Sequence, residues 1–240
     1  MIKVYRKIRQ NLLMENKTGK YLKYAIGEIV LVVIGILIAL QINNWNEERK
    51  QQNKINSIYS VIKSDLKYDI DKFDKIINNM SISDTIFKKV IEKKMTNEDY
   101  QNCEGCRYIL SGYQDVEIEK GGLKLLIDNS ALFESQNDSL FVKISNFYSY
   151  FDTEITASHK EMSTNFFDTW LYWKNNKYWF ADLNNGVKND EIITYMLNSW
   201  DYRNKVSAAY VLQYQVYLKQ LIEYKKDAQI VIEDINELIE

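Results

Sequence analysis

Hydrophobic residues gather near the N-terminus in one long uncharged run. The eighteen residues from Ile29 to Asn46 carry no charge, and the stretch from Ile29 to Leu40 is entirely apolar or small. Eighteen helical residues cover about 27 Å, which is close to the ~30 Å thickness of a bilayer's hydrocarbon layer. The run therefore predicts a transmembrane helix over residues 24–46, and a buried core helix is the alternative.

Aromatic residues flank this run at both ends. Tyr21 and Tyr24 precede it and Trp45 follows it, as expected for side chains that anchor a helix at headgroup depth. More than twenty residues precede the run, and residues 40–45 lack the small residues of a signal-peptidase site. We therefore expect an uncleaved signal anchor rather than a removable secretion signal.

Beyond the run, apolar residues continue in steps of three and four, which is the spacing of an amphipathic helix. This first seam predicts a helix that continues the membrane helix to about Asn79. Ser83 and Asp84 predict the N-cap of a second helix that reaches Lys94. The residues of the first seam are Ile55, Tyr59, Ile62, Leu66, Ile70, Phe73, Ile77 and Met80.

A second seam occupies the C-terminal stretch in a heptad-like register that is interrupted at Lys225. Because each seam needs a partner, we expect the two to pack on each other in an antiparallel helical bundle. Self-association as a coiled coil is the competing arrangement. The residues of the second seam are Val211, Tyr214, Leu218, Leu221, Ala228, Ile232, Ile235 and Ile239.

The stretch between the seams is less regular but also predicts helices. Residues 119–129 and 138–151 have helical patterns, and residues 137–139 supply a cap for the second. The chain has no proline and eight glycines in 240 residues, so the residues that usually break helices are scarce. The predicted fold class is therefore all-α, with an N-terminal transmembrane helix that continues into an exported antiparallel helical bundle.

Charge is distributed unevenly about the apolar run. Residues 1–23 hold seven basic residues and one acidic residue, a net charge of +6, whereas the rest holds 24 basic and 32 acidic residues, a net charge of −8. Basic flanks stay on the cytoplasmic side of a membrane helix. We therefore expect a cytoplasmic segment at 1–23, the transmembrane helix at 24–46 and an exported domain at 47–240. This topology is single-pass in the inner (cytoplasmic) membrane, with the C-terminal domain in the periplasm.

The basic N-terminal segment has a helical pattern of its own. Val4, Tyr5, Ile8 and Leu12 fall at helical spacing among basic residues, which favours a short helix lying on membrane lipid. The alternative is a frayed, charged N-terminus that only determines the topology.

Residues that carry chemistry are few. His159 is the only histidine, and no defined spacing groups it with the several ligands that a metal site needs. The sequence has no glycine-rich phosphate loop and no nucleophile elbow. We therefore expect no cofactor, no metal site, no enzymatic activity and no nucleic-acid partner.

Cys103 and Cys106 form a CxxC motif. This spacing occurs in thioredoxin-type redox centres, which need a βαβ context, and in zinc sites, which need a second cysteine pair. In an oxidising periplasm the two residues favour a small disulfide-closed loop. Unpaired thiols and redox or metal chemistry are the alternatives.

One side of the membrane helix is a candidate contact face. At 100° per residue, Glu28, Gly35, Ala39 and Ile42 share that side, and a small-xxx-small pair is typical of helix contacts within membranes. The alternative is that Glu28 lies at headgroup depth and the face has no partner.

Aromatic residues crowd positions 170–180 around an Asn-Asn pair. Trp170, Trp173 and Trp179 could form an exposed platform on which a glycan stacks. More often such a cluster belongs to the hydrophobic core.

The N-terminal pattern resembles that of a known family. Residues 6–10 (RKIRQ), 24–29 (YAIGEI) and 32–47 (VVIGILIALQINNWNE) are similar to the signature of uncharacterised single-pass membrane proteins of Gram-negative bacteria, grouped by a domain of unknown function. The likeness is close up to about Lys50 and looser across residues 119–150. It implies a membrane-anchored, exported helical domain but brings no activity or site residue. The cysteine pair is not part of this family's pattern.

Two functions from different classes follow. We expect a membrane-anchored structural or interaction protein whose bundle oligomerises or docks an envelope partner. The alternative is a ligand- or glycan-sensing module that uses residues 170–180.

Overall fold

The structure is a computed structural model, and it describes residues 18–134, 138–187 and 189–239. Within these residues every regular element is a helix, which confirms the all-α prediction. The helices are α2 (Thr18–Ile91), α3 (Asn97–Asn102), η1 (Glu104–Tyr108), α4 (Gly121–Asp128), α5 (Ser130–Glu134), α6 (Ser139–Asn176), α7 (Phe180–Asn184), α8 (Asp190–Asn198), α9 (Trp200–Tyr210), η2 (Val211–Tyr217) and α10 (Leu218–Ile239).

The chain divides into two compact units, residues 1–55 and residues 56–240, and α2 supplies residues to both. In the first unit the described residues belong to α2, and their large apolar side chains are exposed from Leu22 to Trp45. The predicted amphipathic segment of the first twenty residues lies largely outside the described residues.

The prediction of a helix break at Ser83 and Asp84 is wrong, because α2 continues without interruption to Ile91. The Asp84 carboxylate does not cap a helix. It accepts a hydrogen bond from the Tyr210 hydroxyl at 3.1 Å and pairs with Lys88 at 2.6 Å. Asp84 therefore connects α2 to α9 from within the helix.

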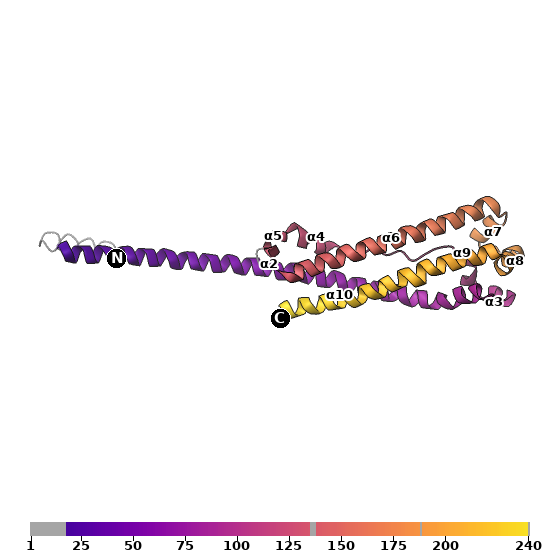
Figure 1. Ribbon diagram of the computed structural model, residues 1–240, viewed down its shortest axis with the longest axis horizontal. Coiled ribbons are helices and arrows are strands. Elements are labelled where there is room, and N and C mark those ends of the chain that lie inside the picture. Colours follow the sequence, from indigo (N-terminus) through magenta and orange to yellow (C-terminus); the bar gives the residue numbers. More distant parts are fainter. Residues whose placement is uncertain (1–17, 135–137, 188, 240) are drawn as a thin grey trace. The chain divides into compact units, whose positions relative to one another are not determined.

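In the second unit, α10 runs against α2 (Figure 1). Side-chain contacts pair early positions of α2 with late positions of α10, and late positions of α2 with the segment before α10. These contacts are Lys63 to Asn236, Asp69 to Tyr224, and Met80 to Tyr214.

α6 lies beside α10 in the same unit (Figure 1). Lys143 pairs with Asp234 near one end, and the Ser158 hydroxyl donates to Gln220 at 2.7 Å further along. The order is again reversed, so α6 and α10 are antiparallel neighbours. The α7–α8 region lies at the end of the unit opposite the C-terminus (Figure 1).

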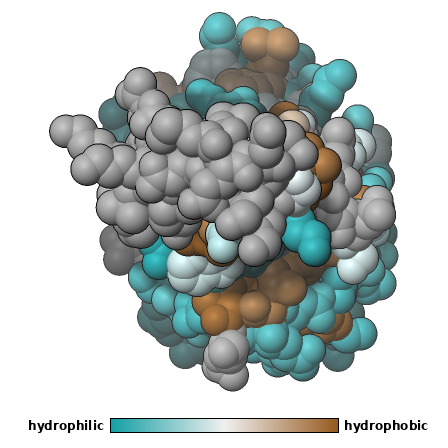
Figure 2. Space-filling model, turned by 90° about the vertical axis from the view of Figure 1, so that its left-hand side faces the viewer, coloured by the Kyte–Doolittle hydropathy of each residue, from teal (hydrophilic) through white to brown (hydrophobic). Residues whose placement is uncertain are grey.

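An aromatic cluster fills the space between the three long helices. The Tyr224 ring lies 4.8 Å from Phe73 on α2, 5.0 Å from Phe147 and 5.1 Å from Phe151 on α6. All four residues are buried. Pairs of rings at these distances stabilise a core beyond the area they bury. On the outside, Figure 2 shows hydrophilic residues over much of the visible surface, with hydrophobic residues between them.

A π-helical segment, η2, changes which residues of the C-terminal stretch face the core. From Tyr202 to Val231, buried positions advance by three or four residues except between Ala209 and Tyr214, where the step is five. A π turn inserts one extra residue, which rotates the following positions around the helix. The predicted seam is therefore partly wrong. Val211 and Ile239 are exposed, and Tyr217 and Tyr224 take the core positions beside Leu218 and Lys225.

The helices predicted for the middle of the chain are present. α4 begins two residues later than expected, and Asp138 caps α6 by accepting hydrogen bonds from the N–H groups of Leu140 and Phe141. α6 runs much further than residue 151 and ends at Asn176. In the first seam, Ile70 and Ile77 are only half-buried, whereas Asp69 and Ile76 are buried.

Candidate functional site

The apolar part of α2 is one candidate functional surface. Among the described residues, α2 is the one helix that is long and apolar enough to cross a membrane, by length and composition, and none of its most apolar window is buried. Glu28, Gly35, Ala39 and Ile42 share one side of this helix by the 100° rule. No atom lies within 4 Å of a Cβ built on Gly35. The predicted contact face is therefore accessible within this unit.

The aromatic residues near the α6–α7 turn divide between the core and the surface. Trp173 and Trp179 are each only 3% exposed, so these two belong to the core, and the alternative of an exposed platform of all three tryptophans is wrong for them. The Trp173 indole N–H donates to the Tyr195 hydroxyl at 3.0 Å, and Tyr195 donates to Asp201 at 2.5 Å. Trp170 remains 36% exposed. This arrangement is a closed hydrogen-bonded chain inside the unit.

Lysines cover the faces of neighbouring rings. Lys177 Nζ lies 4.3 Å from the centre of the Tyr195 ring, and Lys205 Nζ lies 4.1 Å from that of Tyr172. Burial and the hydrogen bond to Asp201 hold the pKa of Tyr195 well above its usual value. Burial alone would raise the pKa of Asp201, but the hydrogen bonds from Lys205 and Tyr195 outweigh it and lower that pKa. These charge contacts stabilise the turn.

His159 lines a groove on the surface of the second unit. Its Nε2 is 2.6 Å from Asp115 Oδ1, and its ring stacks near that of Tyr217. The adjacent groove has a volume of about 440 Å³ and contains the Lys120–Asp152 ion pair. Within the described residues, no group of three or more histidine, cysteine or carboxylate side chains could hold a metal ion. The contact between His159 and Asp115 connects α6 to the segment that precedes α4.

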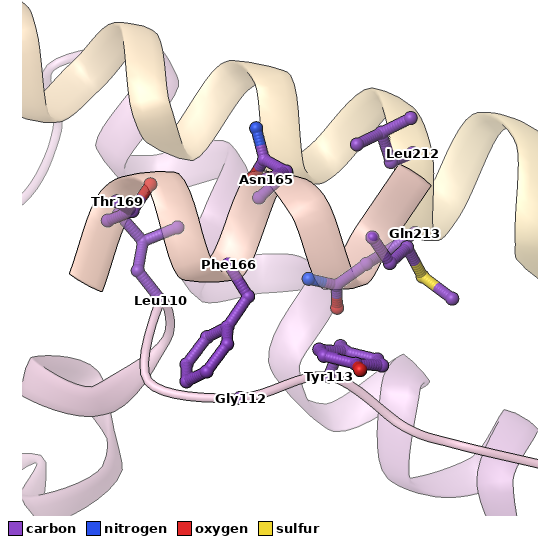
Figure 3. A pocket seen from close by; sticks show the side chains of 10 residues that line it. Leu110, Gly112, Tyr113, Asn165, Phe166, Thr169, Leu212 and Gln213 are labelled. Atoms are coloured by element: carbon purple, nitrogen blue, oxygen red, sulfur yellow. The ribbon is translucent and has the colours of Figure 1, made fainter. Parts of the chain in front are cut away.

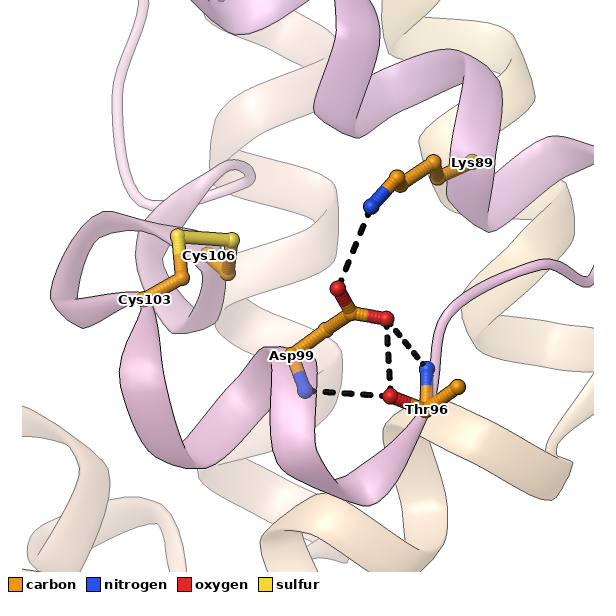
Figure 4. Close-up of polar contacts among 5 residues, drawn as sticks. All are labelled: Lys89, Thr96, Asp99, Cys103 and Cys106. Atoms are coloured by element: carbon orange, nitrogen blue, oxygen red, sulfur yellow. Dashed lines mark hydrogen bonds and ion pairs between the residues drawn. A yellow bond between two sulfur atoms is a disulfide. The ribbon is translucent and has the colours of Figure 1, made fainter.

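A disulfide joins Cys103 and Cys106 at the end of α3. Figure 4 shows how the start of the same helix is held. The Thr96 hydroxyl accepts from the Asp99 N–H at 3.1 Å, while Asp99 Oδ2 accepts from the Thr96 N–H at 2.8 Å. Asp99 also pairs with Lys89 of α2 at 3.1 Å. The turn that carries the disulfide is therefore fixed to α2.

An open groove of the second unit lies between this turn, α2 and η2. We call it the η2 groove, and its volume is about 550 Å³. Its lining residues are Asn79, Met80, Ile82, Ser83, Ile86, Phe87, Cys103, Gly105, Tyr108, Ile109, Gly112, Tyr113, Gln114, Gln213 and Tyr214.

A much smaller cavity of about 10 Å³ lies next to the η2 groove and shares Gly112, Tyr113 and Gln213 with it. Figure 3 shows this cavity between the loop of Gly112 and Tyr113, α6 and η2. Its size is at the lower limit for a single water molecule. Tyr113 and Gln213 therefore lie between this small cavity and the open η2 groove.

A buried polar cluster that no sequence pattern predicts holds the start of α4 against α2. Asp69 is 0% exposed and accepts hydrogen bonds from Tyr224 at 2.7 Å and from the Glu119 N–H at 3.0 Å. Asp65 accepts from the Gly122 N–H at 2.6 Å. The Gly121-Gly122 pair is the one sequence signal that indicates a close approach here.

Comparison with known protein families gives a match over part of the chain. Residues 28–110 match a family of unknown function (DUF6090). No curated protein matches the chain, and no solved structure matches it. The match fits the expected likeness to an uncharacterised domain family. It covers the apolar part of α2, the disulfide turn and much of the α2 wall of the η2 groove.

Proposed function

We propose that the protein is a membrane-anchored interaction protein. The observation that carries this proposal is the wholly exposed apolar window of α2, which is continuous in one helix with a well-packed helical unit. An exposed surface of this kind is costly in water and favourable in a bilayer. The apolar part of α2 would thus anchor the protein in a membrane, and residues 47–240 would be presented to other envelope components.

The orientation is part of the proposal. Seven basic residues precede the apolar run, so residues 1–23 lie in the cytoplasm and the helical unit lies on the periplasmic side of an inner membrane. At the other end of the run, the Arg49 guanidinium lies 5.5 Å from the centre of the Trp45 ring. An exposed tryptophan with a neighbouring cation suits the headgroup region. The resemblance to single-pass proteins of Gram-negative bacteria supports the same topology.

The face of Glu28, Gly35, Ala39 and Ile42 is the proposed contact within the membrane. Small residues allow two helix backbones to approach closely, and packing then replaces the hydrophobic effect as the driving force. The partner is a second copy of this chain or another membrane helix. Outside the membrane, the helical unit supplies the contact with an envelope partner.

Crosslinking in intact membranes tests this function. We expect a crosslinked homo-oligomer or one reproducible enriched partner. Replacing Gly35→Ile together with Ala39→Ile should reduce the crosslinks made within the membrane, because the bulkier side chains separate the backbones. Leu37→Ile, on the opposite side of the helix, is the matched control and should leave them unchanged. A strictly monomeric protein without any enriched partner would contradict the proposal.

A further inference from the structure

The described lining of the η2 groove contains no charged side chain, although the protein is strongly charged. Charged residues make up 27% of the chain, yet none of the fifteen described residues that line the groove is acidic, basic or histidine. The nearest ionic residues of α2, Asp84 and Lys88, pair with each other at 2.6 Å. An ion held only by these described lining residues would lose water without gaining a counter-charge, which is unfavourable.

The lining offers neutral hydrogen-bonding groups beside apolar ones. The lining includes the side-chain amides of Asn79, Gln114 and Gln213. Amide side chains both donate and accept hydrogen bonds. Met80 and Phe87 are buried behind them and supply an apolar base. This combination matches a ligand that has an apolar body and amide or hydroxyl groups.

The walls of the groove are held from several directions. The Tyr214 hydroxyl donates to the Met80 carbonyl at 3.0 Å, and its ring lies 5.2 Å from Phe87. The opposite wall is the turn that the Cys103–Cys106 disulfide closes. The contact of Asp99 with Lys89 holds this turn against α2. The groove thus exists before a ligand arrives, which lowers the entropy cost of binding.

The π-helical segment contributes directly to the site. Gln213 and Tyr214 lie within η2, where the extra residue widens the helix and moves Gln213 off the buried stripe. π turns within α-helices occur frequently at functional sites. A volume of about 550 Å³ lies within the usual range of small-molecule pockets.

From these features we propose that the η2 groove binds an uncharged ligand with an apolar body and amide groups, about the size of a blocked amino acid or dipeptide. The inference goes beyond the membrane-anchored role and does not depend on it. A free small amide and a neutral segment of a larger peptide share this chemistry.

Saturation-transfer NMR on the full-length protein in lipid nanodiscs tests the proposal. The probes are N-acetyl-leucinamide, which is neutral, N-acetyl-leucine, which is anionic at pH 7, and an acetylated, amidated Leu-Gln dipeptide. We expect saturable binding of N-acetyl-leucinamide and at least about tenfold weaker binding of N-acetyl-leucine, since an unpaired charge costs more than 1.4 kcal/mol. Tighter binding of the dipeptide than of the single residue indicates a peptide source, and the reverse indicates a small amide.

Two variants with matched controls complete the test. Gln213→Glu places a charge in the groove at nearly constant shape and should weaken the neutral probe about tenfold. Gln215→Glu, exposed in the same segment, should not. If Gln213→Glu unfolds, Ile82→Asp serves instead, because Ile82 is 73% exposed, with Ile222→Asp as its control. Absent binding of the neutral probe, equal binding of both single-residue probes, or equal effects of variant and control would overturn the proposal.

Discussion

The Tyr224 hydroxyl donates a hydrogen bond to the Asp69 carboxylate at 2.7 Å, and both side chains are completely buried between α2 and α10. Asp69 also pairs with Lys72 at 2.9 Å. Burial and the negative charge of Asp69 keep the pKa of Tyr224 far above its usual range, so the hydroxyl remains a donor at all ordinary pH values. This contact fixes the relative register of the two helices.

Removing the Tyr224 hydroxyl should therefore destabilise the helical unit. Tyr224→Phe removes a hydrogen bond to a charged group, and we expect a loss of about 1.5–3 kcal/mol in the free energy of unfolding. Tyr217→Phe is the matched control. Tyr217 is equally buried on the same C-terminal stretch, but its hydroxyl has no hydrogen-bond partner among the described residues. Urea unfolding of the full-length protein in detergent measures both, and equal effects would contradict the account.

The close contact between α4 and α2 predicts opposite outcomes for two adjacent glycines. A Cβ on Gly122 would lie 2.6 Å from Ile62 Cγ1 and 2.8 Å from the Ile62 backbone. One on Gly121 would meet only the Asp65 carboxylate, at 3.4 Å from Oδ2 and 3.9 Å from Oδ1. Gly122→Ala should therefore cost about 1–3 kcal/mol through overpacking. Gly121→Ala should be neutral or slightly stabilising, since alanine favours helix. Thermal unfolding of the two variants measures both effects. An unchanged unfolding temperature for Gly122→Ala would contradict the close contact between α4 and α2.

Acid should loosen the start of α3. The hydrogen bonds from Thr96 and then the contact with Lys89 lower the pKa of Asp99 below its ordinary value of 3.8. Since the pKa is lower in the folded state, the stabilisation is fully present above the unfolded pKa and is lost as pH falls through the folded one. The protection of the amides of residues 97–102 against hydrogen exchange, relative to their intrinsic exchange rates at each pH, should therefore fall at acid pH.

Carbon NMR of the Asp99 carboxyl group gives the direct measurement. We expect titration below pH 3.8. In the Asp99→Asn variant, the α3 amides should exchange faster at neutral pH. Their protection against exchange should also no longer depend on acid pH. An Asp99 that titrates at or above the ordinary value would show that the capping contacts are absent in solution.

Much of the fold follows from the spacing of apolar residues. The helix caps at Asp138 and the long apolar run of α2 depend on local sequence, so pattern alone predicts them. The break expected at Ser83 does not occur, because a capping residue in mid-helix can direct its side chain to another helix, as Asp84 does to Tyr210. Local propensity cannot register such a tertiary contact.

The sites are harder to predict than the helices. A carboxylate at a seam position, such as Asp69, normally indicates solvent, and only the packing of Tyr224 and residue 119 onto it reveals a buried role. The η2 groove depends on a π turn that no heptad pattern contains, and it joins α2, the disulfide turn and η2 from distant parts of the sequence. The burial of Trp173 likewise depends on Tyr195, two helices later.

The topology of α2 tests the central claim most directly. In a Gram-negative host, we expect the full-length protein to stay with the membrane after alkaline carbonate extraction. We also expect protease added to spheroplasts to digest a tag placed after residue 240. Substituting Ile34→Arg and Leu37→Arg should release the protein, because charges at the bilayer centre cost about 2.5–3.5 kcal/mol each. Extraction of the unmodified protein by carbonate, or complete protection of the tag from protease, would contradict the account.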